Sequence, residues 1–276
     1  MFQEWIRNKT TETVIGHYLQ CGKDSRIKPE GKPHLQAFIN ALKNNPLVPL
    51  SNNIEILNGF DTKSNIHGLE NLELVKEKPF IIAANHPNEG PLRGQGQRFV
   101  MNHYTYKITG KEIRWLHGQD RSSPQNLIRD ILAKKTNSIP VKNKNPQETF
   151  RLLIQAITNK DIMGLNPEGD GSKSGLRRGL PEAGKLIALS ASRLYSVLCV
   201  STIFQNNEFI LNISKPINKE TIIKLIQNPH VENKQIKHQI ISDYVMAIIA
   251  QGLPQEKRGD YSDFNTFIQR FNTLLD

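Results

Sequence analysis

Two short loops carry the residues of this 276-residue chain that are best suited to proton transfer and to anion binding. The first is residues 85–90, with the sequence NHPNEG, and the second is residues 166–172, with the sequence NPEGDGS. His86 is a candidate general base, because the ordinary pKa of histidine, about 6.5, allows proton exchange near neutral pH. Its alternative role is to cap the helix that follows. The glycines of the second loop permit turns that aim backbone N–H groups at an anion.

Each loop follows a short apolar segment that we expect to be a buried strand, over residues 79–84 and 161–165. In open α/β sheets, ligands bind beyond the carboxyl ends of the strands, so both loops fall where a site is expected. Lys142 and Lys144 follow a third expected strand and could reach an anion held between the two loops. A solvated loop is the alternative for these two lysines.

The elements that would position these loops alternate along the chain. Helices have apolar residues on one face, as Leu35, Phe38, Ile39 and Leu42 do near the N-terminus and Phe150, Leu153, Ile154 and Ile157 do in the helix that begins at Pro146. We expect strands over residues 79–84, 113–116, 138–141, 161–165, 195–204 and 208–213, and further helices over 123–135, 180–191, 218–227, 232–252 and 262–275.

This alternation predicts an α/β fold with a mixed, mostly parallel sheet and helices on both faces, together with an N-terminal helical segment. We expect two parts, a helical extension over residues 1–65 that packs on the core and an α/β domain over residues 66–276. The N-terminal helix either packs on the sheet or lies on a membrane, and the lack of a flanking tryptophan belt favours packing.

Composition limits the class of protein. The chain is 37% hydrophobic and 22% charged, which is typical of a folded protein, and no stretch approaches the ~20 apolar residues that would span a bilayer. Its two cysteines predict no disulfide framework, and its start does not read as a secretion signal, so we expect a cytoplasmic protein. The net charge of +10 favours an anionic partner such as acidic lipid, acidic protein or nucleic acid, and plain solubility is the alternative reading.

Three common ligand motifs fail. Residues 170–175 resemble the start of a calcium loop, but Pro181 stands where the last ligand is required, so we predict no metal site. Residues 94–96 lack the third glycine of a dinucleotide fingerprint, and no phosphate-binding GxxxxGK[ST] sequence is present. We therefore expect no cofactor.

The order and spacing of these segments resemble the glycerolipid acyltransferase family, which includes the lysophosphatidate and glycerol-3-phosphate acyltransferases. Its first motif, Asn-His-(x)4-Asp after an apolar strand, is similar to residues 81–86, and its Phe-Pro-Glu-Gly-Thr-Arg-Ser motif is similar to residues 166–172. A strand that ends in a basic residue looks like residues 139–142. The resemblance covers roughly residues 66–215, with weaker agreement to about residue 261, where the late segment 253–259 also looks familiar for bacterial members.

The resemblance implies an O-acyltransferase of phospholipid and glycerolipid metabolism. A histidine takes the proton of an acceptor hydroxyl, which attacks an acyl thioester carried by coenzyme A or by acyl carrier protein. Carried over, His86 is the base, and the residues that hold the glycerol phosphate or lysolipid acceptor are Asn85, Lys142, Lys144, Pro167, Glu168, Gly169 and Ser172. An anionic membrane surface is the implied location, with peripheral attachment to its inner, cytoplasmic face.

Three departures from the family pattern concern the acceptor side. Pro91 stands where the aspartate partner of the histidine is expected, and Glu89 is our hypothesis for the missing carboxylate. Gly171 replaces an arginine, for which Lys173, Arg177 or Arg178 could substitute, and a lysine at 142 or 144 replaces another arginine. The Pro91 departure motivates an alternative, a catalytically inactive relative that binds lipid or an acyl carrier. Nucleic-acid binding is supported by the net charge alone, and we do not expect it.

Overall fold

The structure is a computed structural model that describes residues 32–87, 89–119, 131–142, 146–169, 171 and 175–275. Strands alternate with helices along these residues. The strands are β1 (Lys63–His67), β2 (Phe80–Ala84), β3 (Ile113–Gln119), β4 (Ile139–Lys142), β5 (Ile162–Leu165), β6 (Ser196–Gln205) and β7 (Glu208–Ile213). The α-helices are α3 (Lys32–Asn44), α4 (Leu69–Glu73), α5 (Gly96–Thr109), α7 (Pro146–Thr158), α8 (Pro181–Ala191), α9 (Lys219–Gln227), α10 (Lys234–Gln251) and α11 (Phe264–Thr273). Short 3₁₀ helices are η3 (Ser51–Ile56), η4 (Asn58–Phe60), η5 (Pro91–Gly94), η6 (Gln255–Lys257) and η7 (Gly259–Tyr261).

The described residues group into two compact units. Unit 1 draws on residues 32–64, 89–154 and 204–209, and unit 2 draws on residues 65–87, 155–203 and 210–275. Because unit 1 joins three separated parts of the sequence, these units are a different division from the domains predicted at 1–65 and 66–276. Those domains stay a prediction.

Unit 2 contains most of the sheet, in the strand order β1-β7-β6-β2-β5. Strand β2 is parallel to both of its neighbours, with Ala83 opposite Leu165 of β5 and Cys199 of β6. Strands β6 and β7 form a hairpin whose two turn residues, Asn206 and Asn207, both have positive φ, as the twist of a two-residue hairpin turn requires. All five residues of β2 and all four of β5 are buried, as strands covered on both faces must be. The predicted α/β class, with a mixed and mostly parallel sheet, is confirmed.

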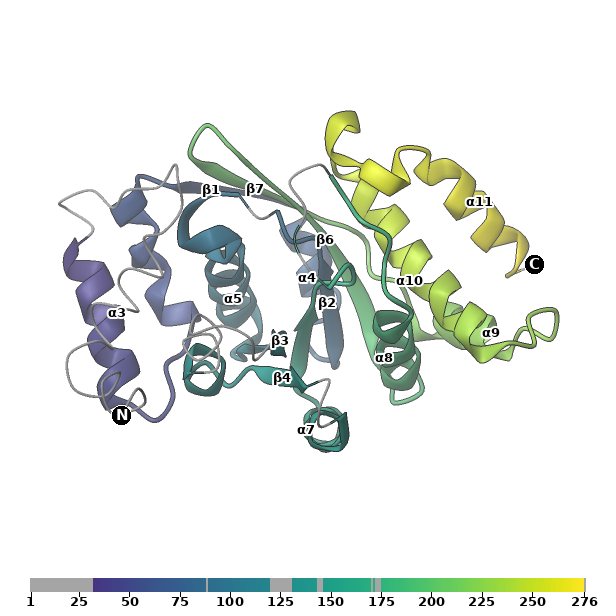
Figure 1. Ribbon diagram of the computed structural model, residues 1–276, viewed down its shortest axis with the longest axis horizontal. Coiled ribbons are helices and arrows are strands. Elements are labelled where there is room, and N and C mark those ends of the chain that lie inside the picture. Colours follow the sequence, from purple (N-terminus) through teal and green to yellow (C-terminus); the bar gives the residue numbers. More distant parts are fainter. Residues whose placement is uncertain are drawn as a thin grey trace. The chain divides into compact units, whose positions relative to one another are not determined.

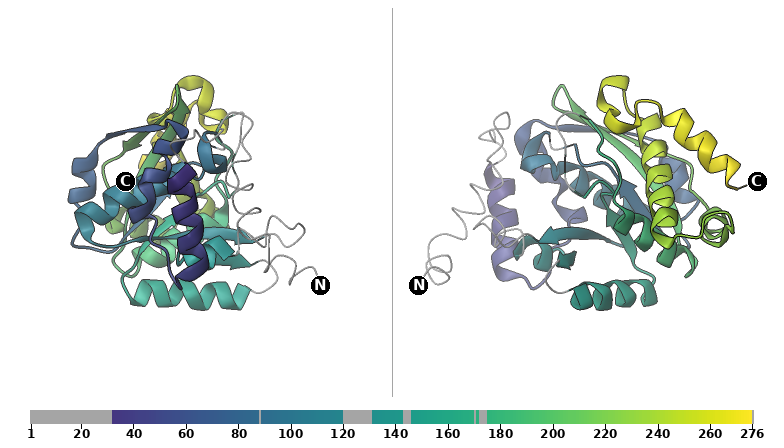
Figure 2. Two further views of the ribbon diagram at one scale, coloured as in Figure 1. Left: turned by 90° about the vertical axis from the view of Figure 1, so that its left-hand side faces the viewer. Right: turned by 45° about the vertical axis from the view of Figure 1, so that its right-hand side comes forward.

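Helix α10 packs against α8, α9 and α11 within unit 2 (Figures 1 and 2). The contact with α8 is close because Gly184 has no side chain. A Cβ atom at this position would overlap the carbonyl oxygen of His238 and lie 2.7 Å from its carbonyl carbon, both in the backbone of α10. The absence of a side chain at residue 184 therefore sets the distance between the two helices.

Helix α3 packs inside unit 1. Its apolar face, formed by Leu35, Phe38, Ile39 and Leu42, is buried, and the ring of Phe38 meets the edge of the Phe99 ring of α5 at 5.5 Å between centroids. The sequence left open whether this face packs on the sheet or lies on a membrane; in the structure it packs on α5 and on the 3₁₀ helices η3 and η4 of the same unit.

Helix α5 was not predicted, because the face that it buries is partly polar. Gln97, Asn102 and Thr105 are buried with Phe99 and Val100, so the apolar residues lack clear helical periodicity. Asn102 lies four residues after Arg98, and its side chain donates to the Arg98 carbonyl and accepts from the amide of Ile113. Asn102 thereby joins α5 to the start of β3.

The predicted buried face of α7 is wrong at Phe150, and Leu153 and Ile154 are only half-buried. Phe150 is 54% exposed, and Thr149 and Ala156 are buried in its place, so the buried face is turned by about one residue. The Thr149 hydroxyl donates to the carbonyl of Pro140 at 2.9 Å, which turns this face toward β4. The predicted helix over residues 123–135 lies largely outside the described residues.

In the part of the chain that the structure describes, no helix is both long and apolar enough to cross a membrane.

Cys199 is a free thiol inside β6, and burial raises its pKa to about 12, so it stays protonated and unreactive.

Candidate functional site

The register of the sheet brings the two loops together. Ala83 of β2 lies opposite Leu165 of β5, and the strands are parallel, so both leave the sheet at the same edge. His86 and Glu168 each lie three residues beyond these paired positions. They therefore arrive beside each other at the carboxyl ends of adjacent strands, where ligands bind in sheets of this kind.

Glu168 connects the loops through its carboxylate. The backbone N–H of His86 donates to Oε1 at 2.6 Å, and the backbone N–H of Arg177 donates to Oε2 at 3.2 Å. Glu168 is 6% exposed, so water competes little for these bonds, and hydrogen bonds to a carboxylate are stronger than those to a neutral acceptor. We expected Glu168 to hold the acceptor. The contacts assign it the positioning of His86, and contact with an acceptor stays a prediction.

Two asparagines fix the backbones on either side. The Asn85 amide group donates to the carbonyl of Thr202 at 2.9 Å and accepts from its N–H at 2.7 Å, so it pairs with β6 as another strand would. Asn166 donates to the carbonyl of Ala84 at 2.8 Å. Asn85 was expected to touch substrate, but it is only 5% exposed, and these bonds give it the task of holding the loop of His86 in place.

The turn at Pro167–Gly169 requires its glycine. Gly169 has φ = +76°, and a Cβ atom there would lie 2.6 Å from Cδ1 of Leu180. The N–H of Gly169 donates back to Asn166, and the N–H of Leu180 donates to the Pro167 carbonyl at 2.8 Å. The Gly169 amide, which the sequence suggested could face an anion, is thus used to close the turn.

The structure does not test the remaining predicted site residues. Glu89 and Lys142 belong to unit 1 and His86 to unit 2, so the proposed pairing of Glu89 with His86 stays a prediction. Lys144 and Ser172, and the side chain of Lys142, lie outside what the structure describes, and their roles also stay predictions.

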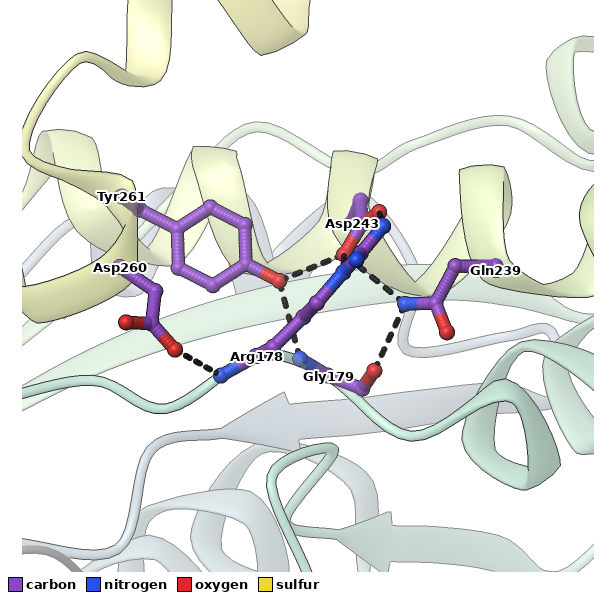
Figure 3. Close-up of polar contacts among 6 residues, drawn as sticks. All are labelled: Arg178, Gly179, Gln239, Asp243, Asp260 and Tyr261. Atoms are coloured by element: carbon purple, nitrogen blue, oxygen red, sulfur yellow. Dashed lines mark hydrogen bonds and ion pairs between the residues drawn. The ribbon is translucent and has the colours of Figure 1, made fainter.

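Arg178, one of the cations that could replace the missing arginine, is instead paired with a carboxylate of α10. Its Nη2 lies 3.0 Å from Oδ2 of Asp243, and its Nε donates to Oδ1 at 3.4 Å (Figure 3). The hydrogen bond and charge of Asp243 raise the pKa of Arg178 above its ordinary value. Of the other two candidates, Arg177 is exposed and Lys173 lies outside the described residues. The exchange of the missing arginine for Arg177 or Lys173 therefore stays a prediction.

The arrangement can support proton transfer by a histidine whose backbone is fixed. Among the described residues, no group of three or more His, Cys, Asp or Glu side chains is placed to hold a metal ion. No protein-family model and no curated protein matches the chain, so the assignment of a function depends on its own residues.

Proposed function

We propose that this protein is an O-acyltransferase that moves a fatty acyl group from a thioester to the hydroxyl of a glycerol phosphate, a lysophospholipid or a related acceptor. The observation that carries the proposal is the Glu168 carboxylate, which holds the backbone of His86 and the backbone of Arg177 at once. This contact joins the two segments that resemble the glycerolipid acyltransferase motifs. Fixing a general base against its substrate is a large part of the rate that such a base supplies.

His86 would act as the general base. Its ring takes the proton of the acceptor hydroxyl as the oxygen attacks the thioester carbonyl, and a new C–O bond forms. The C–S bond then breaks, and the thiolate of coenzyme A or acyl carrier protein leaves with the proton that the histidine returns. The reaction balances without a metal, an oxidant or a reductant.

The charge of the chain fits the substrates and the location of this chemistry. The net charge of +10 attracts anionic lipid surfaces, the phosphates of coenzyme A and acidic acyl carrier protein. We therefore propose that the protein works in the cytoplasm as a peripheral protein on the inner face of the membrane.

The proposal is tested by incubating the purified protein with radiolabelled palmitoyl thioesters of coenzyme A and of acyl carrier protein. The acceptors are glycerol 3-phosphate, lysophosphatidate and lysophosphatidylglycerol. We expect label to appear in an ester product in step with release of free thiol. Binding of the thioester without transfer to any acceptor would overturn the proposed acyltransferase activity and would favour the alternative, an inactive binding protein, that Pro91 suggests.

The role of Glu89 is tested by Glu89→Gln. If Glu89 orients the His86 ring and stabilises its charged form, we expect kcat to fall by about tenfold or more, because an unsupported histidine is a poorer base. The measurement is the initial rate of acyl transfer, with Glu70→Gln on the exposed surface of α4 as the matched control. A kcat near that of the wild type would remove Glu89 from the mechanism.

A further inference from the structure

Residues 176–180, here called the bridging segment, have a hydrogen-bond partner for every backbone N–H. The five donors reach the Lys257 carbonyl, Glu168 Oε2, Asp260 Oδ2, the Tyr261 hydroxyl and the Pro167 carbonyl, in that order along the segment. Since buried backbone groups need partners, this complete pairing fixes the path of the segment.

The five bonds point to two different parts of unit 2. The N–H groups of Arg177 and Leu180 bond to the turn at Pro167–Gly169, and those of Leu176, Arg178 and Gly179 bond to residues 257–261. The carbonyl of Leu176 also accepts from the N–H of Asp260 at 3.0 Å. The bridging segment therefore links residues 257–261 to the carboxylate that holds His86.

Tyr261 and Asp243 form the centre of this link (Figure 3). The Tyr261 hydroxyl accepts from the N–H of Gly179 at 2.9 Å and donates to Oδ1 of Asp243 at 2.8 Å. Tyr261 is fully buried and Asp243 is 8% exposed. Burial raises the pKa of Tyr261, so its hydroxyl keeps the proton that it donates.

The bridging segment also contacts α10 directly, through a hydrogen bond from Gln239 and through the close packing of Gly179. The Gln239 amide donates to the carbonyl of Gly179 at 2.8 Å and to Oδ1 of Asp243 at 2.9 Å. A Cβ atom on Gly179 would overlap the Ser242 hydroxyl and lie 3.0 Å from Cγ of Met246. The backbone of Gly179 thus lies directly against α10, and its N–H and C=O groups are both bonded to side chains.

We propose that Tyr261 and Asp243 are positioning residues for His86. They hold the bridging segment where the Arg177 amide reaches Glu168, and Glu168 in turn fixes the backbone of His86. This inference rests on the proposed acyl transfer for its kinetic consequence, whereas the chain of contacts can be tested without it.

The first test is Tyr261→Phe, which removes the hydroxyl and keeps the ring that packs on Phe267 at 4.9 Å between centroids. We expect kcat for acyl transfer to fall on the order of tenfold, with the KM for the acyl donor little changed, because the base is displaced while donor contacts remain. Tyr244→Phe is the matched control, since Tyr244 follows Asp243 on α10 and its ring stacks on Phe271. An equal kcat in the two variants would overturn the inference.

The second test follows amide hydrogen exchange in the protein without substrate. We expect the peptides that contain Gly179, Arg177 and His86 to exchange faster in Tyr261→Phe than in the wild type and Tyr244→Phe. Unchanged exchange at His86 would overturn the inference even if Gly179 exchanged faster. If the wild type transferred no acyl group, the proposed function would fail, and this measurement would still decide the positioning.

The third test combines Tyr261→Phe with Glu168→Gln. If Tyr261 acts through Glu168, the double variant should lose little more kcat than Glu168→Gln alone, because the second change breaks a link that is already broken. Effects that multiply would mean that Tyr261 acts only on general stability, and would overturn the inference.

Discussion

Replacing His86 with glutamine is expected to lower kcat for acyl transfer by roughly 10²- to 10⁴-fold, the usual contribution of a general base. Glutamine has similar size but cannot take a proton from the acceptor hydroxyl. The bond to Glu168 comes from the backbone N–H of residue 86, so the substitution keeps it. We therefore expect the free energy of unfolding to change by less than about 1 kcal/mol.

The measurement is the initial rate of ester formation, with thermal unfolding followed on the same preparation. His67→Gln is the matched control, since His67 is an exposed histidine at the end of β1 in the same unit. Acyl transfer that proceeds at the same rate in His86→Gln as in His67→Gln would show that another residue is the base.

Replacing Gly184 with alanine is expected to destabilise unit 2 strongly. Two effects oppose each other, since alanine in a helix is worth up to about 1 kcal/mol more than glycine, whereas overpacking costs typically 1–3 kcal/mol and sometimes more. The added Cβ atom would overlap the carbonyl oxygen of His238, and backbone cannot rotate aside as a side chain does. We expect the cost of the overlap to exceed the gain in helix propensity, because α8 and α10 must move apart to make room for the Cβ atom.

We expect a loss of about 3 kcal/mol and a fall in Tm on the order of 5–10 °C, measured by calorimetry or circular dichroism. Gly118→Ala in β3 is the control, because a Cβ atom there meets nothing within 4 Å. A Tm for Gly184→Ala equal to or above that of the wild type would mean that the helices are not packed as closely as described.

The alternation of apolar strands and helices was readable because β2, β5 and β6 are continuous buried runs. The pairing of the two loops could also be expected from the sequence, since residues that follow parallel strands share one edge of the sheet. The register that sets His86 and Glu168 beside each other could not, because it depends on which strands are neighbours and on how they are aligned. The position of the two loops was therefore predictable from the sequence, whereas the bonds of Glu168 to the backbone of His86 became visible only in the structure.

Errors arose where buried residues are polar or where an apolar residue is exposed. Helix α5 buries Gln97 and Asn102, and α7 exposes Phe150 while it buries Thr149, so hydrophobic periodicity gave no signal in the first case and a misplaced face in the second. In both helices a side-chain hydrogen bond to neighbouring backbone makes the polar burial tolerable. Such bonds cannot be read from spacing along the chain.

Two residues of Figure 3, Asp243 and Tyr261, were missed for a related reason. Asp243 and Tyr261 lie far beyond the second loop in the sequence, and neither belongs to a recognisable motif. Lys257 and Asp260 pair with Leu176 of the bridging segment, a contact that no sequence pattern indicated, and the resemblance of segment 253–259 to the family stays a prediction.

The link from Tyr261 to the bridging segment also bears on when the site can form during translation. The ribosome makes both loops early, but Tyr261 follows only after α8, β6, β7, α9 and α10 have been made. A nascent chain that stops before Lys257 lacks all three groups that bond to the amides of residues 176, 178 and 179, namely the Lys257 carbonyl, the Asp260 carboxylate and the Tyr261 hydroxyl. Truncated translation products should therefore lack the ordered bridging segment, even when they contain every residue of both loops.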